Sequence, residues 1–103
     1  MSTTLAELSE LAESVSRRYA KRFGIERDAA WYLAKLTEEM GELQAAYLDH
    51  HGQSRRTLEP TLSQARLDDE LADLLMTTLL FARWQAIDID AAVERKWGQH
   101  RPQ

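Results

Sequence analysis

One segment, residues 67–82, constrains the fold more strongly than any other part of the chain. Its apolar residues surround nearly the whole circumference of a helix: Leu67, Leu71, Leu74, Leu75, Met76, Leu79, Leu80, Phe81 and Ala82. A helix that is apolar all round is buried, either inside a bundle or against a partner chain. The segment therefore predicts a buried helix over about 62–86 in an all-α protein.

Two helices are predicted before this segment. The first covers about 4–23, where apolar residues recur at helical spacing, with Thr4 and Glu7 as a capping box and Gly24 as a stop. The second runs from its cap residue Asp28 to about His51 and ends at Gly52. The predicted core face of this second helix consists of Ala29, Leu33, Leu36, Met40, Leu43 and Tyr47.

The remaining segments are a loop and a short helix. Residues 52–63 are rich in glycine, proline and hydroxyl side chains, which predicts a loop, and Pro60 is suited to begin the next helix. The loop's two arginines, Arg55 and Arg56, either contact an anionic ligand or are simply solvated. Asp88 predicts a fourth helix over about 89–99, whose inner face would consist of Ala92, Val93 and Trp97.

Length and composition bound the protein class. A chain of 103 residues is one domain, 1–103, and we expect a four-helix, bundle-like fold. A core this small favours assembly as a dimer or tetramer. The net charge of −4 does not suit a nucleic-acid binder. The chain has no cysteine, no apolar run long enough to cross a membrane and no signal-peptide pattern at its start, so we expect a cytoplasmic protein.

Two acidic pairs interrupt the apolar pattern. Glu39 and Glu42 are three residues apart on the second predicted helix, and Glu70 and Asp73 have the same spacing on the third. Each pair therefore shares one side of a helical turn. Glu39 lies roughly 80° from the centre of the apolar stripe, at its border, whereas Glu38 points almost directly away from it. If the two helices face each other, the four carboxylates form an oxygen-rich cage for a hard divalent cation.

The alternatives to such a cage are solvated acidic pairs and a di-iron site. Solvated pairs are common on helices, but here both pairs border an apolar stripe. Di-iron bundles use a Glu-x-x-His motif, and no histidine follows these glutamates at that spacing. Oxygen ligation favours Mg²⁺ or Mn²⁺. Cations held by a few carboxylates usually bind substrate phosphates as well, so phosphate chemistry is the expected use.

The acidic segments resemble a known signature. Leu36-Thr37-Glu38-Glu39-Met40-Gly41-Glu42-Leu43, followed by Glu70-Leu71-Ala72-Asp73, is similar to the Glu-Glu-x-x-Glu … Glu-x-x-Asp pattern of the MazG-type all-α nucleoside triphosphate pyrophosphohydrolases. The resemblance covers about 28–100. It implies that Glu39, Glu42, Glu70 and Asp73 bind the metal. It also implies hydrolysis of nucleoside triphosphates to monophosphate and pyrophosphate, with non-canonical or excess nucleotides as the expected substrates.

Further residues receive roles from the resemblance or from their position. Glu38 or one of the metal ligands, with Glu39 foremost, is the candidate catalytic base. Lys35 matches the lysine of the family's Lys-Leu-x-Glu-Glu stretch, and it either contacts a phosphate or pairs with Glu39. Lys96 resembles a phosphate-binding lysine, although Glu94 and Trp97 differ from the family's asparagine and phenylalanine. Trp31 is placed on the side of Lys35 and Glu42, where it either stacks on a base or belongs to the core.

Two other functions remain open. The chain could be a non-enzymatic helical interaction module, or a related pyrophosphohydrolase that acts on phosphoribosyl nucleotides. Mg²⁺ binding distinguishes the module from the enzymes.

Overall fold

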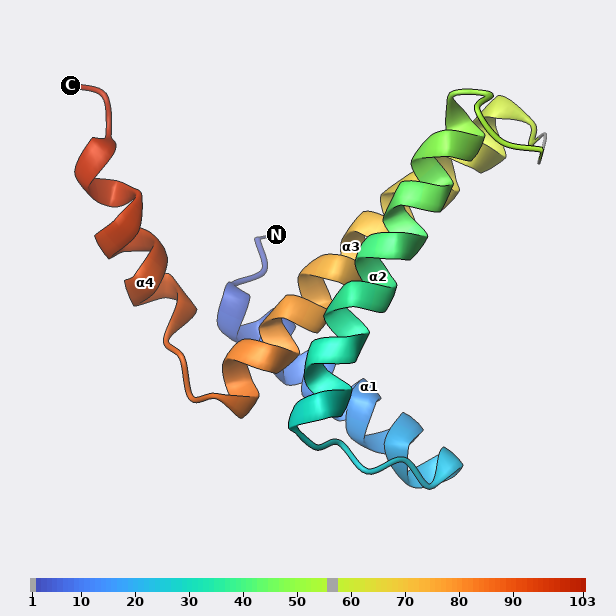
Figure 1. Cartoon of the computed structure of the whole chain (residues 1–103). Helices are drawn as coiled ribbons and strands as arrows, with labels where there is room; N and C mark the ends of the chain where they lie inside the picture. Colours follow the sequence, from blue (N-terminus) through green and yellow to red (C-terminus); the bar gives the residue numbers. More distant parts are fainter. Residues whose placement is uncertain (1, 56–57) are drawn as a thin grey trace.

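Four α-helices and one short 3₁₀ helix make up the structure, a computed structural model that describes residues 2–55 and 58–103 (Figure 1). The helices are α1 (Leu5–Phe23), α2 (Ala29–His50), α3 (Pro60–Trp84), α4 (Ile89–Lys96) and the 3₁₀ helix η1 (Gly98–His100). The described residues contain no strand, which confirms the all-α prediction.

The helix starts follow the predicted caps. Thr4 and Glu7 form a complete capping box, in which the Glu7 backbone N–H donates to the Thr4 hydroxyl and the Thr4 N–H donates to the Glu7 carboxylate. Gly24 ends α1 at φ +63°, a left-handed conformation that a side chain rarely adopts. Asp28 and Asp88 cap α2 and α4 by accepting backbone N–H groups.

One helix start was predicted and one helix end was not. Pro60 begins α3, as expected, within the predicted loop range 52–63, and the Glu59 carboxylate caps the helix by accepting the N–H groups of Thr61 and Leu62. The fourth helix was expected to reach 99, but α4 ends at Lys96 and the chain continues as η1.

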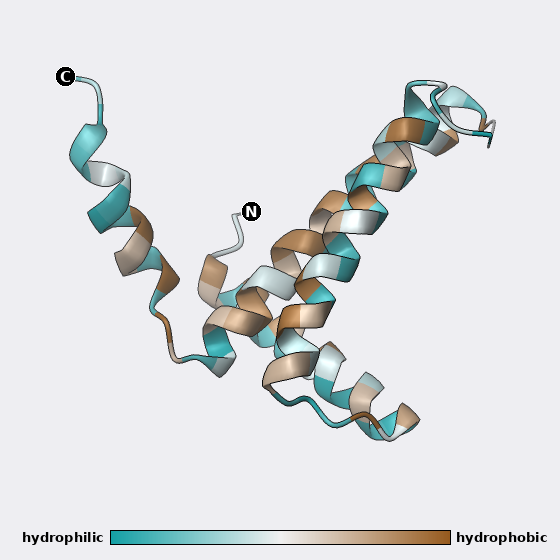
Figure 2. Ribbon diagram, in the orientation of Figure 1, coloured by the Kyte–Doolittle hydropathy of each residue, from teal (hydrophilic) through white to brown (hydrophobic). Residues whose placement is uncertain are grey.

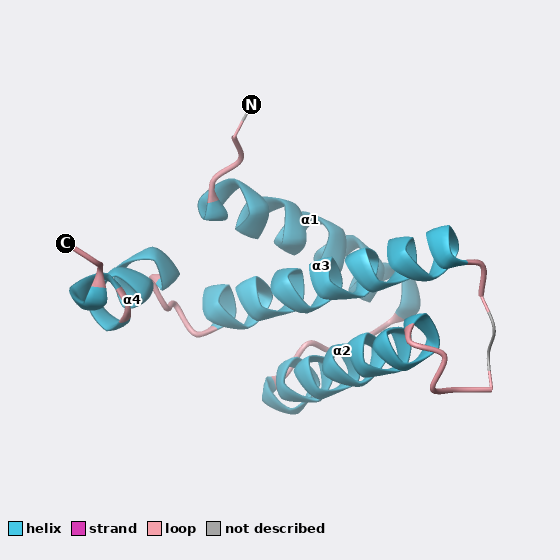
Figure 3. Ribbon diagram, turned by 90° about the horizontal axis from the view of Figure 1, so that it is seen from above, coloured by secondary structure: helices cyan, strands magenta, loops and turns pink. Residues whose placement is uncertain are grey.

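The helices α2 and α3 form a long antiparallel hairpin, and α1 crosses α3 near one end of it (Figures 1 and 3). In contrast, α4 extends away from the hairpin and packs mainly with η1. The radius of gyration is 16.2 Å, whereas a compact domain of this length has a value of about 13 Å. The four helices of one chain therefore do not close into a bundle, which corrects the bundle-like expectation.

The buried core lies where α1 meets the hairpin. Ala12, Tyr32 and Leu80 are its centre, and Trp31, Met76 and Phe81 pack against it. The ring of Tyr32 stacks on that of Trp84 at a centroid distance of 4.7 Å. One small apolar centre thus joins the three helices that carry most of the sequence.

Much of the predicted core surface is exposed in the single chain. On α2, Leu33, Met40 and Tyr47 are 44–54% exposed, and the face that packs on α3 is rotated towards Tyr32 and Ala46. Exposed apolar residues also occur along α3 and α4, whose ribbons include hydrophobic segments (Figure 2). The third helix is not buried all round, because within one chain it packs only against α1 and α2.

No helix in the described part of the chain combines the length and apolar character needed to cross a membrane.

Candidate metal centre

Three of the four predicted metal ligands converge between α2 and α3. Glu39 from α2 and Glu70 and Asp73 from α3 each present an oxygen, and these three oxygens lie within 4.8 Å of one another. Opposite oxygens around an octahedral Mg²⁺ are about 4.2 Å apart, twice the usual ligand distance. The donor set therefore fits a hard divalent cation after small side-chain adjustments.

Glu42, the fourth predicted ligand, lies outside this cluster. Its side chain is 52% exposed, and its carboxylate lies 3.9 Å from the guanidinium of Arg66. Arg66 also forms an ion pair with Asp49. The spacing of three residues places Glu42 one turn from Glu39, but the structure directs its side chain towards Arg66.

The electrostatics of the cluster favour a bound cation. Loss of hydration raises the pKa of the Glu39 carboxyl, and the negative charges of Asp73, Glu38 and Glu70 raise it further, against the opposing effect of Lys35. Loss of hydration also raises the pKa of Glu70, with Asp73 and Glu42 adding to the shift. Carboxylates that repel one another in this way are stabilised when a cation neutralises them.

Lys35 lies beside the cluster and contacts both neighbouring glutamates. Its ammonium nitrogen donates to Glu38 at 2.5 Å and lies 3.6 Å from Glu39. The predicted ion pair between Lys35 and Glu39 is therefore present. The Glu38 side chain is 57% exposed, and Glu38 lies outside the three-carboxylate cluster, as expected from its place on the helix.

A groove of about 520 Å³ connects the cluster to the core. Lys35, Glu39 and Asp73 supply its charged groups, and Trp31 lines it as well. Trp31 also packs edge-on against Tyr32 at 4.9 Å. Trp31 therefore belongs to the edge of the core, as one alternative predicted, and its stacking on a base stays a prediction.

The three carboxylates lie within a segment that matches a known family, whereas the α1 side of the groove lies before it. The sequence model of the MazG nucleotide pyrophosphohydrolase domain matches residues 27–98, more than two thirds of the chain. The chain belongs to the MazG family. No curated protein and no solved structure matches the chain significantly.

Within this MazG domain, Lys96 lies apart from the carboxylate cluster of its own chain, and its contact with a phosphate stays a prediction. Lys96 is the last residue of α4, which extends away from the hairpin, and it does not line the groove. Arg55 is exposed in the loop between α2 and α3, and Arg56 lies outside the described residues.

Sequence reasoning missed two features of the MazG domain's site. It did not identify Arg66, because an arginine without a motif carries no signal of its partners. It also treated α1 only as an amphipathic helix, whereas Leu11, Ala12, Val15, Ser16 and Tyr19 form one side of the groove. The helical spacing of these residues was visible, but nothing in the spacing distinguishes a groove wall from a packed face.

Proposed function

We propose that this MazG domain is a Mg²⁺-dependent enzyme that hydrolyses ribo- or deoxyribonucleoside triphosphates to the monophosphate and pyrophosphate. The observation that carries the proposal is the convergence of Glu39, Glu70 and Asp73 beside a groove that Glu39 and Asp73 also line. The family match supports a nucleotide substrate. Mn²⁺ is an alternative ion, because it accepts the same oxygen ligands.

The three converging carboxylates would hold the ion, and Glu42 would join them by turning from Arg66. A Mg²⁺ ion bound there would neutralise phosphoryl oxygens and lower the pKa of a bound water. The groove beside the cluster gives the rest of the substrate a place to bind, which a purely structural ion site does not need.

The reaction adds one water across the anhydride between the α- and β-phosphates. The water oxygen bonds to one phosphorus, the bridging P–O bond breaks, and pyrophosphate and monophosphate separate. A carboxylate accepts the proton that the water loses. We propose that this base is Glu38 or one of the metal-binding carboxylates, with Glu39 as the first candidate.

Three side chains are proposed to bind the substrate. Lys35 is already beside the carboxylates and is suited to a phosphate oxygen, and Trp31 offers an aromatic surface in the groove. Lys96 is proposed to bind a phosphate of a nucleotide held by another copy, because α4 extends away from its own hairpin.

We also propose that the protein assembles as a homodimer or homotetramer. Its four helices leave large apolar side chains more than 40% exposed, including Leu33, Tyr47, Leu71 and Val93. Leu43, Tyr47, Leu48, Leu67 and Leu71 line a second groove of about 660 Å³ far from α1. Contiguous apolar surface of this kind is typical of protein–protein interfaces.

The expected role is removal of non-canonical or excess nucleotides. A panel of nucleoside triphosphates and phosphoribosyl nucleotides with Mg²⁺, assayed separately for pyrophosphate and orthophosphate, tests the chemistry. Pyrophosphate from a nucleoside triphosphate supports the proposal. Turnover of phosphoribosyl nucleotides alone identifies the related pyrophosphohydrolase. No turnover, together with no Mg²⁺ binding, identifies a helical interaction module.

A further inference from the structure

The lining of the groove beside the metal cluster is chemically divided between its helices. Lys35, Glu39 and Asp73 of α2 and α3 supply its charged groups, and α1 supplies an apolar side with Leu11, Val15 and Tyr19. These three α1 side chains are 53–58% exposed. A volume of about 520 Å³ is within the range of small-molecule sites, which usually combine an apolar lining with a few polar groups.

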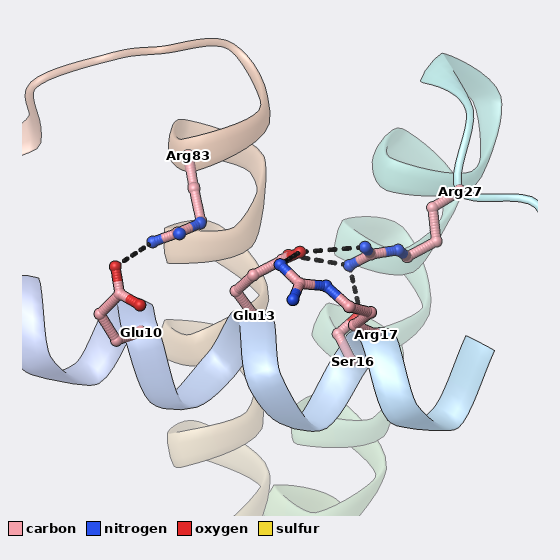
Figure 4. Close-up of polar contacts among 6 residues, drawn as sticks. All are labelled: Glu10, Glu13, Ser16, Arg17, Arg27 and Arg83. Carbon is pink, nitrogen blue, oxygen red and sulfur yellow. Dashed lines mark hydrogen bonds and ion pairs between the residues drawn. The ribbon is translucent and has the colours of Figure 1, made fainter. Parts of the chain in front are cut away.

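A largely buried ion pair holds the α1 side of the groove in place. The guanidinium of Arg27 donates to the Glu13 carboxylate at 2.9 and 3.1 Å and to the Ser16 hydroxyl at 3.1 Å (Figure 4). Glu13 and Ser16 belong to α1, and Ser16 itself lines the groove. Arg27 stands just before α2, so this contact ties the apolar wall to the helix that carries Glu39.

The geometry points to a specificity role for α1. We propose that Leu11, Val15 and Tyr19 form the wall that receives the nucleobase, with Trp31 of α2 as a second aromatic surface, when the phosphates bind at Glu39, Glu70 and Asp73. This inference rests on the proposed function. It assigns base recognition to a helix that lies before the family segment 27–98.

A nucleobase is flat, aromatic and uncharged, and the α1 side of the groove offers an aromatic and uncharged surface for it. A nucleobase stacks on aromatic side chains, with a gain of about 1–3 kcal/mol per base. Tyr19 and Trp31 are the aromatic residues of this groove, and the part supplied by α1 contains no charged side chain. The charged groups of α2 and α3 suit the phosphates and the ion, so the two parts of the lining match the two halves of a nucleotide.

The main competing occupant of this wall is a second copy of the chain. A copy would cover Tyr19 and Val15 permanently and would leave no surface for a base. The continuity of the wall with Lys35 and Glu39 favours the nucleotide, because a protein partner has no need for a carboxylate cluster beside its groove.

The test compares Tyr19→Ala with the matched control Tyr47→Ala. Tyr47 is similarly exposed, at 49% against 53% for Tyr19, but it lines the distant second groove. Each variant is titrated calorimetrically with Mg²⁺ and either a nucleoside monophosphate or inorganic tripolyphosphate, which has no base. Kinetics with a nucleoside triphosphate and the mass in solution are measured alongside.

We expect Tyr19→Ala to weaken monophosphate binding and raise KM by at least about fivefold, with tripolyphosphate binding, mass and fold unchanged. Tyr47→Ala should leave monophosphate binding unchanged. Equal losses for monophosphate and tripolyphosphate would overturn the inference, as would unchanged monophosphate binding. A changed mass with unchanged binding would assign the wall to a second copy. If Tyr19→Ala does not fold, the uncharged substitution Val15→Ala gives the same comparison. Failure of the wild-type enzyme to release pyrophosphate would instead count against the proposed function.

Discussion

Arg27 and Glu13 form a bidentate ion pair that joins the start of α2 to the middle of α1 (Figure 4). The two side chains are only 17% and 14% exposed. Glu13 also accepts a hydrogen bond from Arg17 at 3.0 Å. The pair joins α1 to the hairpin beside the apolar core of Ala12, Tyr32 and Leu80.

A double-mutant cycle with Arg27→Ala and Glu13→Ala should measure this contact. We expect a coupling free energy of about 1–2 kcal/mol in denaturant unfolding, because charge-assisted bonds shielded from water are the stronger kind. The Arg83–Glu10 pair between α3 and α1 is the matched control, since its side chains are 37% and 72% exposed. Its coupling should be smaller, and equal couplings would contradict the account.

Acid should weaken the same contact. The hydrogen bond from Arg27 lowers the pKa of Glu13 below its ordinary value of 4.5. A lowered carboxyl pKa means that the stabilisation is complete above pH 4.5 and is lost as the pH falls through the lowered pKa. The stability difference between wild type and Glu13→Gln should therefore shrink on acidification below pH 4.5, as measured by thermal unfolding.

Mg²⁺ binding should depend more strongly on the three clustered carboxylates than on Glu38 or Glu42. Calorimetry with Glu39→Gln should show a loss of site-specific Mg²⁺ heat, and Glu38→Gln, in the exposed neighbour, should retain it. Glu42→Gln should weaken binding less than Glu39→Gln, because Glu42 lies beside Arg66 and must turn to reach the ion. Equal losses for Glu39→Gln and Glu38→Gln would contradict the geometry of the cluster.

In the metal-free protein, the contribution of Glu39 to stability should fall as the pH rises from its ordinary pKa of 4.5. The pKa of Glu39 is raised in the folded chain, so the folded state holds more protons than the unfolded state between 4.5 and the raised value. Glu39→Gln should remove this loss and increase the melting temperature by about 2–5 °C. Added Mg²⁺ should stabilise wild type more as the pH rises through this window. A melting temperature of Glu39→Gln below that of wild type in metal-free buffer would oppose this view.

Lys96 can be tested by mixing subunits. If Lys96 acts on the site of another copy, Glu39→Gln and Lys96→Ala chains should each be inactive alone. An equal mixture of the two should recover about a quarter of wild-type activity, because half of the random dimers are mixed and each mixed dimer has one complete site. Mixing wild type with the chain that carries both changes is the control. No recovery from inactive parents would place Lys96 in its own chain's site, and full activity of Lys96→Ala alone would remove it from the site.

The sequence predicted the helices well because their starts are local chemistry. The capping box at Thr4 and the cap at Asp28 depend on residues within one turn, and both form as expected. The same locality explains the convergence of Glu70 and Asp73, which share a turn of α3. Pro60 begins α3, as its position predicted, although the Glu59 cap before it was not recognised.

Packing was less predictable than the helices. The apolar stripe of Leu33, Met40 and Tyr47 indicated one buried face, but the described chain leaves this stripe exposed and packs Tyr32 and Ala46 instead. The period of the apolar residues shows which side of a helix is apolar, but it does not show which element packs against that side. The position of Glu42 beside Arg66 and the groove wall on α1 likewise depend on contacts between distant residues, which spacing does not encode.

The most direct test of the central claim is a stoichiometric product assay with a nucleoside triphosphate and Mg²⁺. The account predicts one pyrophosphate and one nucleoside monophosphate for each triphosphate consumed, with turnover lost in Glu39→Gln and Glu70→Gln. Orthophosphate and nucleoside diphosphate as the products, or wild-type turnover in Glu39→Gln, would contradict it.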